Sequence, residues 1–151
     1  MAIFKLLIKN IKDSYKHIPY TLKHRKKLLE LEEIFTGKRS YYFHDLDKVI
    51  MYALFPYLGT KIIYKIHARL NKHHVKYWRG INKMDKVQAV LDWESARYTK
   101  PDKPMNAAET LVYHYPHLIS EFEDTFASLG LEEQLNKTVD EWIIKAGGII
   151  E

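Results

Sequence analysis

Residues 41–50 have the sequence YYFHDLDKVI. Aromatic side chains lead directly into His44 and Asp45, and a second acid and an amine follow at Asp47 and Lys48. Carboxylates at the start of a helix suit the positive end of its dipole, so the stretch predicts that a helix begins here. The polar cluster has two interpretations at this point. It is either a polar helix start that happens to contain histidine, or the centre of a metal site.

Apolar residues recur at helical spacing on both sides of this stretch, and no segment shows the two-residue alternation of a strand. Pro19 and Gly37 predict the beginning and the end of one helix. Asn106 and Glu109 have the spacing of a capping box, which predicts another helix start. The expected helices are an N-terminal one before Pro19 and others at about 20–36, 44–55, 58–71, 83–98, 106–115, 117–130 and 131–146, the last stopped by Gly147-Gly148. We expect an all-α, single-domain helical bundle of about seven to eight helices.

Composition favours one globular domain over residues 1–151, because 46% of the residues are hydrophobic and 28% are charged. The chain has no cysteine, which excludes a disulfide scaffold, a thiolate zinc site and a cysteine nucleophile. No apolar run approaches the roughly 20 residues that span a bilayer. The N-terminus lacks the features of a signal peptide. We therefore expect a cytoplasmic protein with no membrane partner.

Charge is divided unevenly along the chain. Residues 1–100 contain 21 Lys and Arg against 9 Asp and Glu, whereas residues 101–151 contain 3 against 10. The basic part predicts either an anionic ligand or a solvated face that pairs with the acidic one. The acidic helices of about 106–148 follow a segment, about 20–105, that carries the chemically informative motifs.

Several polar residues stand in settings unusual for a surface. His24 lies in the basic stretch KHRKK, and His67, His73 and His74 crowd into HARLNKHHVKYW. Asp92 lies in the apolar stretch AVLDWESA, where a carboxylate is costly unless it is paired or bound to a cation. One alternative is a hydrogen bond to a backbone amide or a lysine. Imidazole and carboxylate are also the ligands that borderline and hard divalent metals prefer.

The order of these residues resembles a known signature. His24, then His44-Asp45, then Asp92 is similar to the H…HD…D pattern of the HD-domain metal-dependent phosphohydrolases, which are all-helical. HDLDK, with Lys48, resembles the family's HD-x-x-K arrangement, and LDWESAR resembles the region of its last aspartate. More narrowly, residues 20–105 are similar to an uncharacterised family of phages and bacteria with H-D-L-x-K, N-x-H-H-x-x-Y-W and D-W segments.

This resemblance implies a site with one or two divalent ions, chosen from Mn, Fe, Mg, Co, Ni and Zn. Its implied ligands are His24, His44, Asp45 and Asp92 for a first ion, and His67 with His73 or His74 for a second, with Asp45 bridging. Asp45 and Lys48 would be catalytic, Lys48 by stabilising phosphoryl charge. Arg69, Lys72 and Arg97 would recruit an anionic substrate. Aromatic residues on helices usually belong to the core, and we expect this of Tyr77, Trp78 and Trp93.

The function predicted from these residues is a metal-dependent phosphohydrolase acting on a nucleotide or another small phosphoester. If a phage encodes the protein, its expected location is the cytoplasm of the bacterial host. Three alternatives remain open. One is a di-iron oxygenase of the HD type, one is a protein that binds nucleic acid through its basic face, and one is a scaffold with a vestigial site. The oligomeric state is not predicted.

Overall fold

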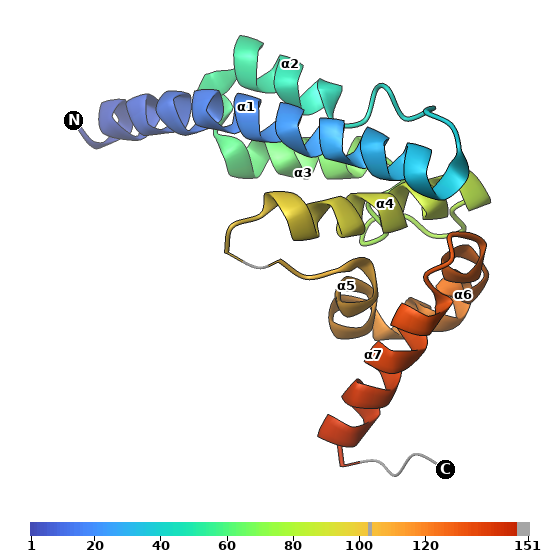
Figure 1. Ribbon diagram of the computed structural model, residues 1–151. Helices are drawn as coiled ribbons and strands as arrows, with labels where there is room; N and C mark the ends of the chain where they lie inside the picture. The colour runs from blue at the N-terminus through green and yellow to red at the C-terminus, as the bar shows by residue number, and fades with distance from the viewer. Residues whose placement is uncertain (103, 148–151) are drawn as a thin grey trace.

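Helices account for all the regular structure in the computed structural model, which describes residues 1–102 and 104–147 (Figure 1). The elements are α1 (Ala2–Thr36), α2 (Leu46–Leu54), η1 (Pro56–Leu58), α3 (Thr60–Leu70), α4 (Lys83–Thr99), α5 (Ala107–His114), η2 (Pro116–Leu118), α6 (Ile119–Ser128) and α7 (Glu132–Lys145). Seven α-helices and no strand within the described ranges confirm the predicted all-α, single-domain bundle.

The long helix α1 corrects one prediction. Pro19 lies inside α1, so the helix that we expected to begin after it is continuous with the N-terminal one. Proline removes one backbone hydrogen bond and costs a helix about 3 kcal/mol or more. Packing on both sides of Pro19 offsets this cost. Before it, the Ser14 hydroxyl donates to the Pro56 carbonyl at 2.9 Å, and after it, Leu28 is fully buried. The predicted end at Gly37 is confirmed by its left-handed backbone, with φ 71°.

The core has two parts, which meet at α4. A small cluster joins α1 to α4 through Leu28, Leu31 and Leu91. A larger cluster joins α4 to α5, α6 and α7. Its buried members are Val75, Ala89, Val90, Ala107, Ala108, Leu111, Val112, Phe122, Phe126, Leu129 and Leu135. Figure 1 shows the resulting arrangement, with α1 to α4 together and α7 descending from them towards the C-terminus. Because α4 contributes to both clusters, it is the structural centre of the domain.

Local signals define several helix ends. The predicted capping box forms at α5, since Asn106 Oδ1 accepts from the Glu109 amide and Glu109 Oε2 accepts from the Asn106 amide, each at 2.8 Å. Pro116 begins η2, which separates α5 from α6, as expected from this proline. At the end of α7 the Gly147 amide donates to the Ile144 carbonyl at 3.0 Å, and Gly148 lies outside the described residues.

A buried carboxylate holds the segment that leads to His44. Glu32 is fully buried in α1, and its side chain accepts from the Ser40 amide at 2.8 Å, from the Tyr41 amide at 3.1 Å and from the Ser40 hydroxyl. These bonds turn the chain back after Gly37 and bring the residues before α2 against α1. Glu32 thus connects the end of α1 to the start of the HDLDK stretch.

We expect Glu32→Ala to lower the free energy of unfolding by about 1–3 kcal/mol, because it removes the fully buried acceptor of the bonds from Ser40 and Tyr41. Chemical denaturation followed by circular dichroism measures this change. Glu33→Ala is the matched control. Its side chain is 56% exposed and pairs with Arg39 on the surface, so its effect should stay within about 0.5 kcal/mol. Equal effects of the two substitutions would contradict the role given to Glu32.

Candidate metal centre

The side chains predicted as metal ligands converge in the interior. They come from five places: His24 from α1, His44 and Asp45 from the start of α2, His67 from α3, His73 and His74 from the segment after α3, and Asp92 from α4. The ligand atoms form two groups of His and Asp, and within each group they lie no more than 4.8 Å apart. Each group could hold a metal ion. Residues up to 68 positions apart in the chain thus meet at one site.

The first group consists of His24, His44 and Asp92. His24 Nε2 lies 2.6 Å from Asp92 Oδ1, and His44 Nε2 lies 3.5 Å from the same oxygen. The Asp92 side chain is mostly buried, with 16% of its surface exposed. The carboxylate that looked costly in the sequence is therefore paired with two imidazoles.

The second group consists of Asp45, His67, His73 and His74. The rings of His73 and His74 lie 4.3 Å apart between centroids, and both histidines belong to the group. Asp45 Oδ1 lies 3.1 Å from His67 Nε2 and 3.6 Å from His44 Nε2. Asp45 therefore stands between the two groups, which is the position that a bridging ligand requires.

The centre contains an unusual concentration of unpaired buried polar atoms. Within the described part of the chain, six of its atoms have no hydrogen-bond partner, namely Nε2 of His44, His67, His73 and His74 and both carboxylate oxygens of Asp45. Lys48 Nζ lies 2.5 Å from Asp45 Oδ2, but this ion pair lacks the alignment of a hydrogen bond. A buried polar atom without a partner costs about 1–3 kcal/mol. A divalent cation would satisfy such a set of nitrogen and oxygen atoms, so the residues present fit a metal.

A second layer of contacts orients two of the imidazoles. Nδ1 of His67 donates to the Asp47 carboxylate, at 2.8 and 2.7 Å from its oxygens, and Asn71 Nδ2 donates to Asp47 Oδ2 at 2.9 Å. Nδ1 is thereby engaged and Nε2 of His67 faces Asp45. Metal-bound histidines characteristically have such a carboxylate on the other ring nitrogen.

His24 is oriented by a hydroxyl in the same way. Thr99 Oγ1 donates to the Ser95 carbonyl at 3.0 Å, so it accepts from Nδ1 of His24, which is also 3.0 Å away. Nε2 of His24 then faces the centre, 2.6 Å from Asp92 Oδ1. The side-chain amide of Gln88 contacts Nδ1 of His44 at 3.0 Å, which again leaves Nε2 facing inward.

The backbone of Asp45 is strained. Its φ of 60° and ψ of 4° lie in the left-handed region, and it is the sole non-glycine residue with positive φ across residues 1–102 and 104–147. Such a conformation costs on the order of 1–3 kcal/mol and persists where the surroundings impose it. Turn hydrogen bonds from the His44 and Leu46 amides enclose it. The strain falls on the residue that stands between the two groups.

The electrostatics keep His73 and His74 neutral and Asp45 and Asp92 ionised. Burial lowers the pKa of His73 to about 3 and that of His74 to about 4. Burial opposes ionisation of Asp45, but His44, His67 and Lys48 together hold its pKa well below the usual value. Contacts with the imidazoles of His24 and His44 likewise keep the pKa of Asp92 low against the effect of burial. Neutral imidazoles and charged carboxylates are the forms that bind metals.

His67 differs from the other imidazoles. Burial works against its charged form, yet contacts with Asp45 and Asp47 raise its pKa above the ordinary value. The two carboxylates on either side of the ring are the cause. A cation bound beside Asp45 would compete for the same electron pair on Nε2, so metal binding and protonation of His67 exclude each other.

A cavity of about 490 Å³ opens beside the centre, and His24, His74 and Asp92 form part of its wall. Three lysines line it, Lys48, Lys61 and Lys100. The described lining includes none of the cations predicted to recruit substrate. Arg97 pairs with Glu94 at 3.0 Å, Lys72 lies over the Trp78 ring, and Arg69 is exposed. Their role as substrate contacts stays a prediction, and Lys61 and Lys100 are additional candidates.

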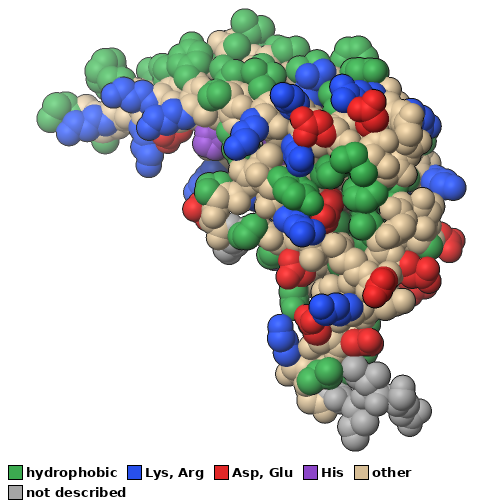
Figure 2. Space-filling model, viewed as in Figure 1, with side chains coloured by type: hydrophobic (Ala, Val, Ile, Leu, Met, Phe, Trp, Pro, Cys, Tyr) green, Lys and Arg blue, Asp and Glu red, His purple; other side chains and the backbone are tan. Residues whose placement is uncertain are grey.

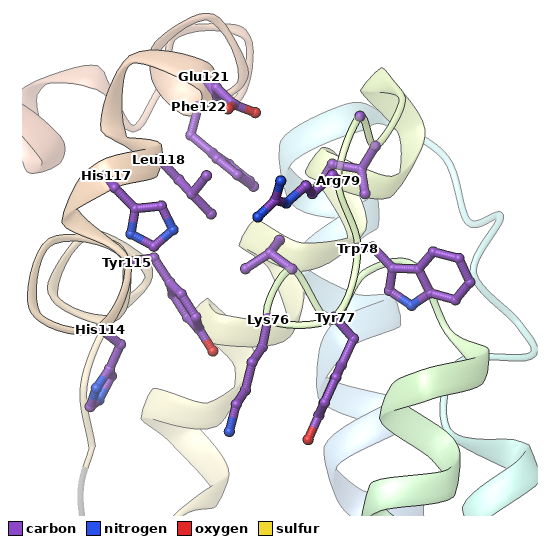
Figure 3. Close-up of a pocket in the computed structure, with 13 residues that line it drawn as sticks. Lys76, Tyr77, Trp78, Arg79, His114, Tyr115, His117, Leu118, Glu121 and Phe122 are labelled. Carbon is purple, nitrogen blue, oxygen red and sulfur yellow. The ribbon is translucent and has the colours of Figure 1, made fainter.

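A second cavity, of about 750 Å³, adjoins the first (Figure 3). His114 and Tyr115 line both, and Lys76, Tyr77 and Arg79 belong to the second alone. Tyr77 is 38% exposed, so the expectation that it belongs to the core is wrong. It lies in the irregular segment between α3 and α4 rather than on a helix. Trp93 does pack against the larger core cluster, as expected, and also lines the first cavity.

Sequence reasoning missed the second layer of contacts. The sequence predicts Asp47 only as an acid at a helix start. It gives Asn71, Thr99 and Gln88 no predicted role. One signal was present in the sequence, because His67 and Asn71 are four residues apart and therefore share a face of α3. The remaining partners depend on how α1, α2 and α4 come together.

Comparisons of the chain with protein-family models, with curated proteins and with solved structures find no match. The resemblance to HD-domain phosphohydrolases stays a prediction.

We expect Asp47→Ala to weaken the binding of Mn²⁺ by 10–100-fold, because His67 loses the partner that orients it. Isothermal titration calorimetry on protein stripped with a chelator measures the affinity. Asp140→Ala, an exposed acid on α7, is the control and should bind as the parent does. Parental affinity in the Asp47 variant would remove the orienting role from this carboxylate.

Proposed function

We propose that this protein is a metal-dependent phosphohydrolase that acts on a small phosphoester, such as a nucleotide. One observation supports this proposal above all others. Six unpaired nitrogen and oxygen atoms of Asp45 and four histidines face one another in the interior, beside a cavity with three lysines. A site of nitrogen and oxygen ligands suits divalent cations, and the lysines suit an anionic substrate.

Two ions are the natural complement of the two groups. His24, His44 and Asp92 would hold one, and His67, His73 and His74 would hold the other, with Asp45 between them. When bound, divalent ions supply a hydroxide nucleophile at neutral pH by acidifying water, and they neutralise charge on a phosphoryl group. The chain contributes the fixed directions of its imidazoles, through Asp47 for His67 and Thr99 for His24.

Among the residues that line the cavity, Lys48 would contact the substrate most directly. Its ammonium group lies beside Asp45 and lines the cavity, and its side chain is 15% exposed. A phosphoryl group in the cavity would place its oxygens within reach of this cation, which stabilises the charge that develops there. Lys61 and Lys100 add positive charge at the same wall and raise the local concentration of anions.

The size of the cavity limits the substrate. About 490 Å³ suits a small molecule rather than a polymer, and Trp93, Tyr64 and Tyr115 provide aromatic surface for its organic part. Hydrolysis at the His and Asp groups and binding of the remainder in the cavity would then occur on one continuous surface.

A di-iron oxygenase is the second candidate, because the two groups contain five histidines and iron readily takes such ligands. Iron content of the protein as purified, followed by oxygen uptake, separates this candidate from a hydrolase. Turnover of phosphoesters with a redox-inactive ion such as Mg²⁺ or Zn²⁺ favours the hydrolase.

The direct test is a screen of nucleoside mono-, di- and triphosphates and p-nitrophenyl phosphate, with each of Mn²⁺, Mg²⁺, Co²⁺, Ni²⁺, Zn²⁺ and Fe²⁺. We expect released phosphate with at least one combination, and loss of both bound metal and hydrolysis in Asp45→Ala. Elemental analysis measures the metal. Lack of hydrolysis in every combination by the metal-loaded protein, or full activity in Asp45→Ala, overturns the proposal.

Lys48→Ala separates binding of metal from turnover. We expect it to retain bound metal and to reduce kcat by about 10²–10³-fold, the usual effect of removing one group that stabilises charge in the transition state. Lys137→Ala, an exposed residue on α7, is the matched control and should leave kcat unchanged. A parental rate in the Lys48 variant excludes its contact with the phosphoryl group.

A further inference from the structure

The first three turns of α1 extend past the other helices (Figure 1). Ser14 is the first buried residue of α1, and the side chain of Asn10, which donates to the Tyr57 carbonyl at 3.0 Å, marks the point where the helix reaches η1. Before Asn10 the large apolar residues are exposed: Ile3 by 85%, Phe4 by 66% and Leu6 by 58%, followed by Leu7 and Ile8. A helix end of this composition leaves a large apolar surface in contact with water.

Charge on this helix end is confined to one stripe. Lys5, Lys9, Lys12 and Lys16 follow one another at spacings of four and three, so they lie along one side of the helix. The apolar residues occupy the rest of its circumference. No acid occurs among residues 1–12, and Figure 2 shows the projecting end covered by hydrophobic and basic side chains. The helix end is therefore amphipathic and positively charged.

More apolar surface lies where α1 meets η1. Leu54, Phe55 and Tyr57 are exposed there, and Ser14 and Asn10 attach this segment to α1 through the Pro56 and Tyr57 carbonyls. Figure 2 shows hydrophobic side chains continuing from the projecting end along the upper edge of the molecule. The exposed apolar surface thus extends from the helix end onto the body of the domain.

We propose that the projecting end of α1 binds an anionic lipid surface. An amphipathic helix with a basic stripe lies in the plane of the membrane interface, its apolar side among the upper acyl chains and its lysines beside the headgroups. Each lysine near an anionic surface adds to the attraction. This mode needs no spanning segment, and within the described ranges no helix is both long and apolar enough to cross a bilayer.

The charge pattern favours lipid over a second copy of the same surface. Two copies that pair through their apolar sides would leave Lys5, Lys9 and Lys12 without a counter-charge from the partner copy, whereas anionic headgroups supply one. The apolar side is also broader than the narrow seam that a pair of helices buries. The competing partner is the acidic part of another copy, which includes Glu132, Glu133, Asp140 and Glu141 on α7.

A membrane partner was not expected from the sequence, because no apolar run is long enough to span a bilayer, and the apolar N-terminal stripe was assigned to one of the helices of the bundle. Exposure of the whole helix end up to Asn10 shows that this end does not pack on the bundle. The proposal does not depend on the metal centre, which lies farther along α1 at His24.

The test is co-sedimentation of the full chain with vesicles of phosphatidylglycerol and phosphatidylcholine in equal parts, compared with vesicles of phosphatidylcholine alone. We expect binding to the anionic vesicles at least tenfold tighter than to the neutral ones, weakened by salt. Phe4→Glu combined with Leu6→Glu should reduce it at least tenfold. Both residues are exposed, so the variant should keep the parental circular dichroism and melting temperature.

Ile144→Glu is the matched control. Ile144 is an apolar residue on α7 with 59% exposure, similar to that of Leu6, and its substitution should leave binding unchanged. Equal binding by the parent and the Phe4/Leu6 variant overturns the proposal, as does failure of the parent to bind anionic vesicles. A third outcome is that the parent does not bind vesicles but self-associates in a salt-sensitive way. If Phe4→Glu with Leu6→Glu abolishes this self-association, the partner of the helix end is a second copy of the chain instead.

Discussion

The arrangement of this structure depends on one constraint. Several nitrogen and oxygen atoms in the interior have no hydrogen-bond partner among the described residues. A protein ordinarily pairs such atoms, because water is absent and each unpaired atom destabilises the fold. Here four imidazoles and a carboxylate leave six of them facing one another. The surrounding helices nevertheless hold the imidazoles in fixed directions, with hydrogen bonds on the opposite side of the rings of His24 and His67. Such an arrangement of oriented nitrogen and oxygen atoms could hold a divalent cation.

The elements of the fold can be understood from this arrangement. Continuity of α1 through Pro19 lets one helix support η1 near Ser14 and also carry His24 into the interior. Glu32, at the far end of α1, turns the chain back so that His44 and Asp45 enter beside it. In turn, α4 contributes Asp92 to the site and Val90 and Leu91 to the core. The helix that supplies the acid therefore also belongs to both parts of the core.

Much of this could be predicted from the sequence, and the parts that could not have identifiable causes. Helical periodicity, the capping box at Asn106 and the order of histidines and acids depend on local spacing, which the sequence contains directly. The helix start predicted at Pro19 was wrong because packing on both sides of this residue outweighs the local preference of proline for a helix end. The roles of Arg69, Lys72 and Arg97 were predicted from proximity in sequence, and they stay predictions. Arg69 follows His67 by two residues, which turns its side chain to nearly the opposite face. Lys61 and Lys100 reach the cavity from positions far from any motif.

The left-handed backbone of Asp45 has a consequence for how the protein would behave in a cell. This strain and the unpaired atoms around it cost stability, and a bound cation would offset part of that cost. A ligand that binds only the folded chain multiplies the ratio of folded to unfolded chains by 1 + [L]/Kd. Abundance of the protein would then follow the supply of free metal, since chains that remain unloaded unfold more often and are degraded.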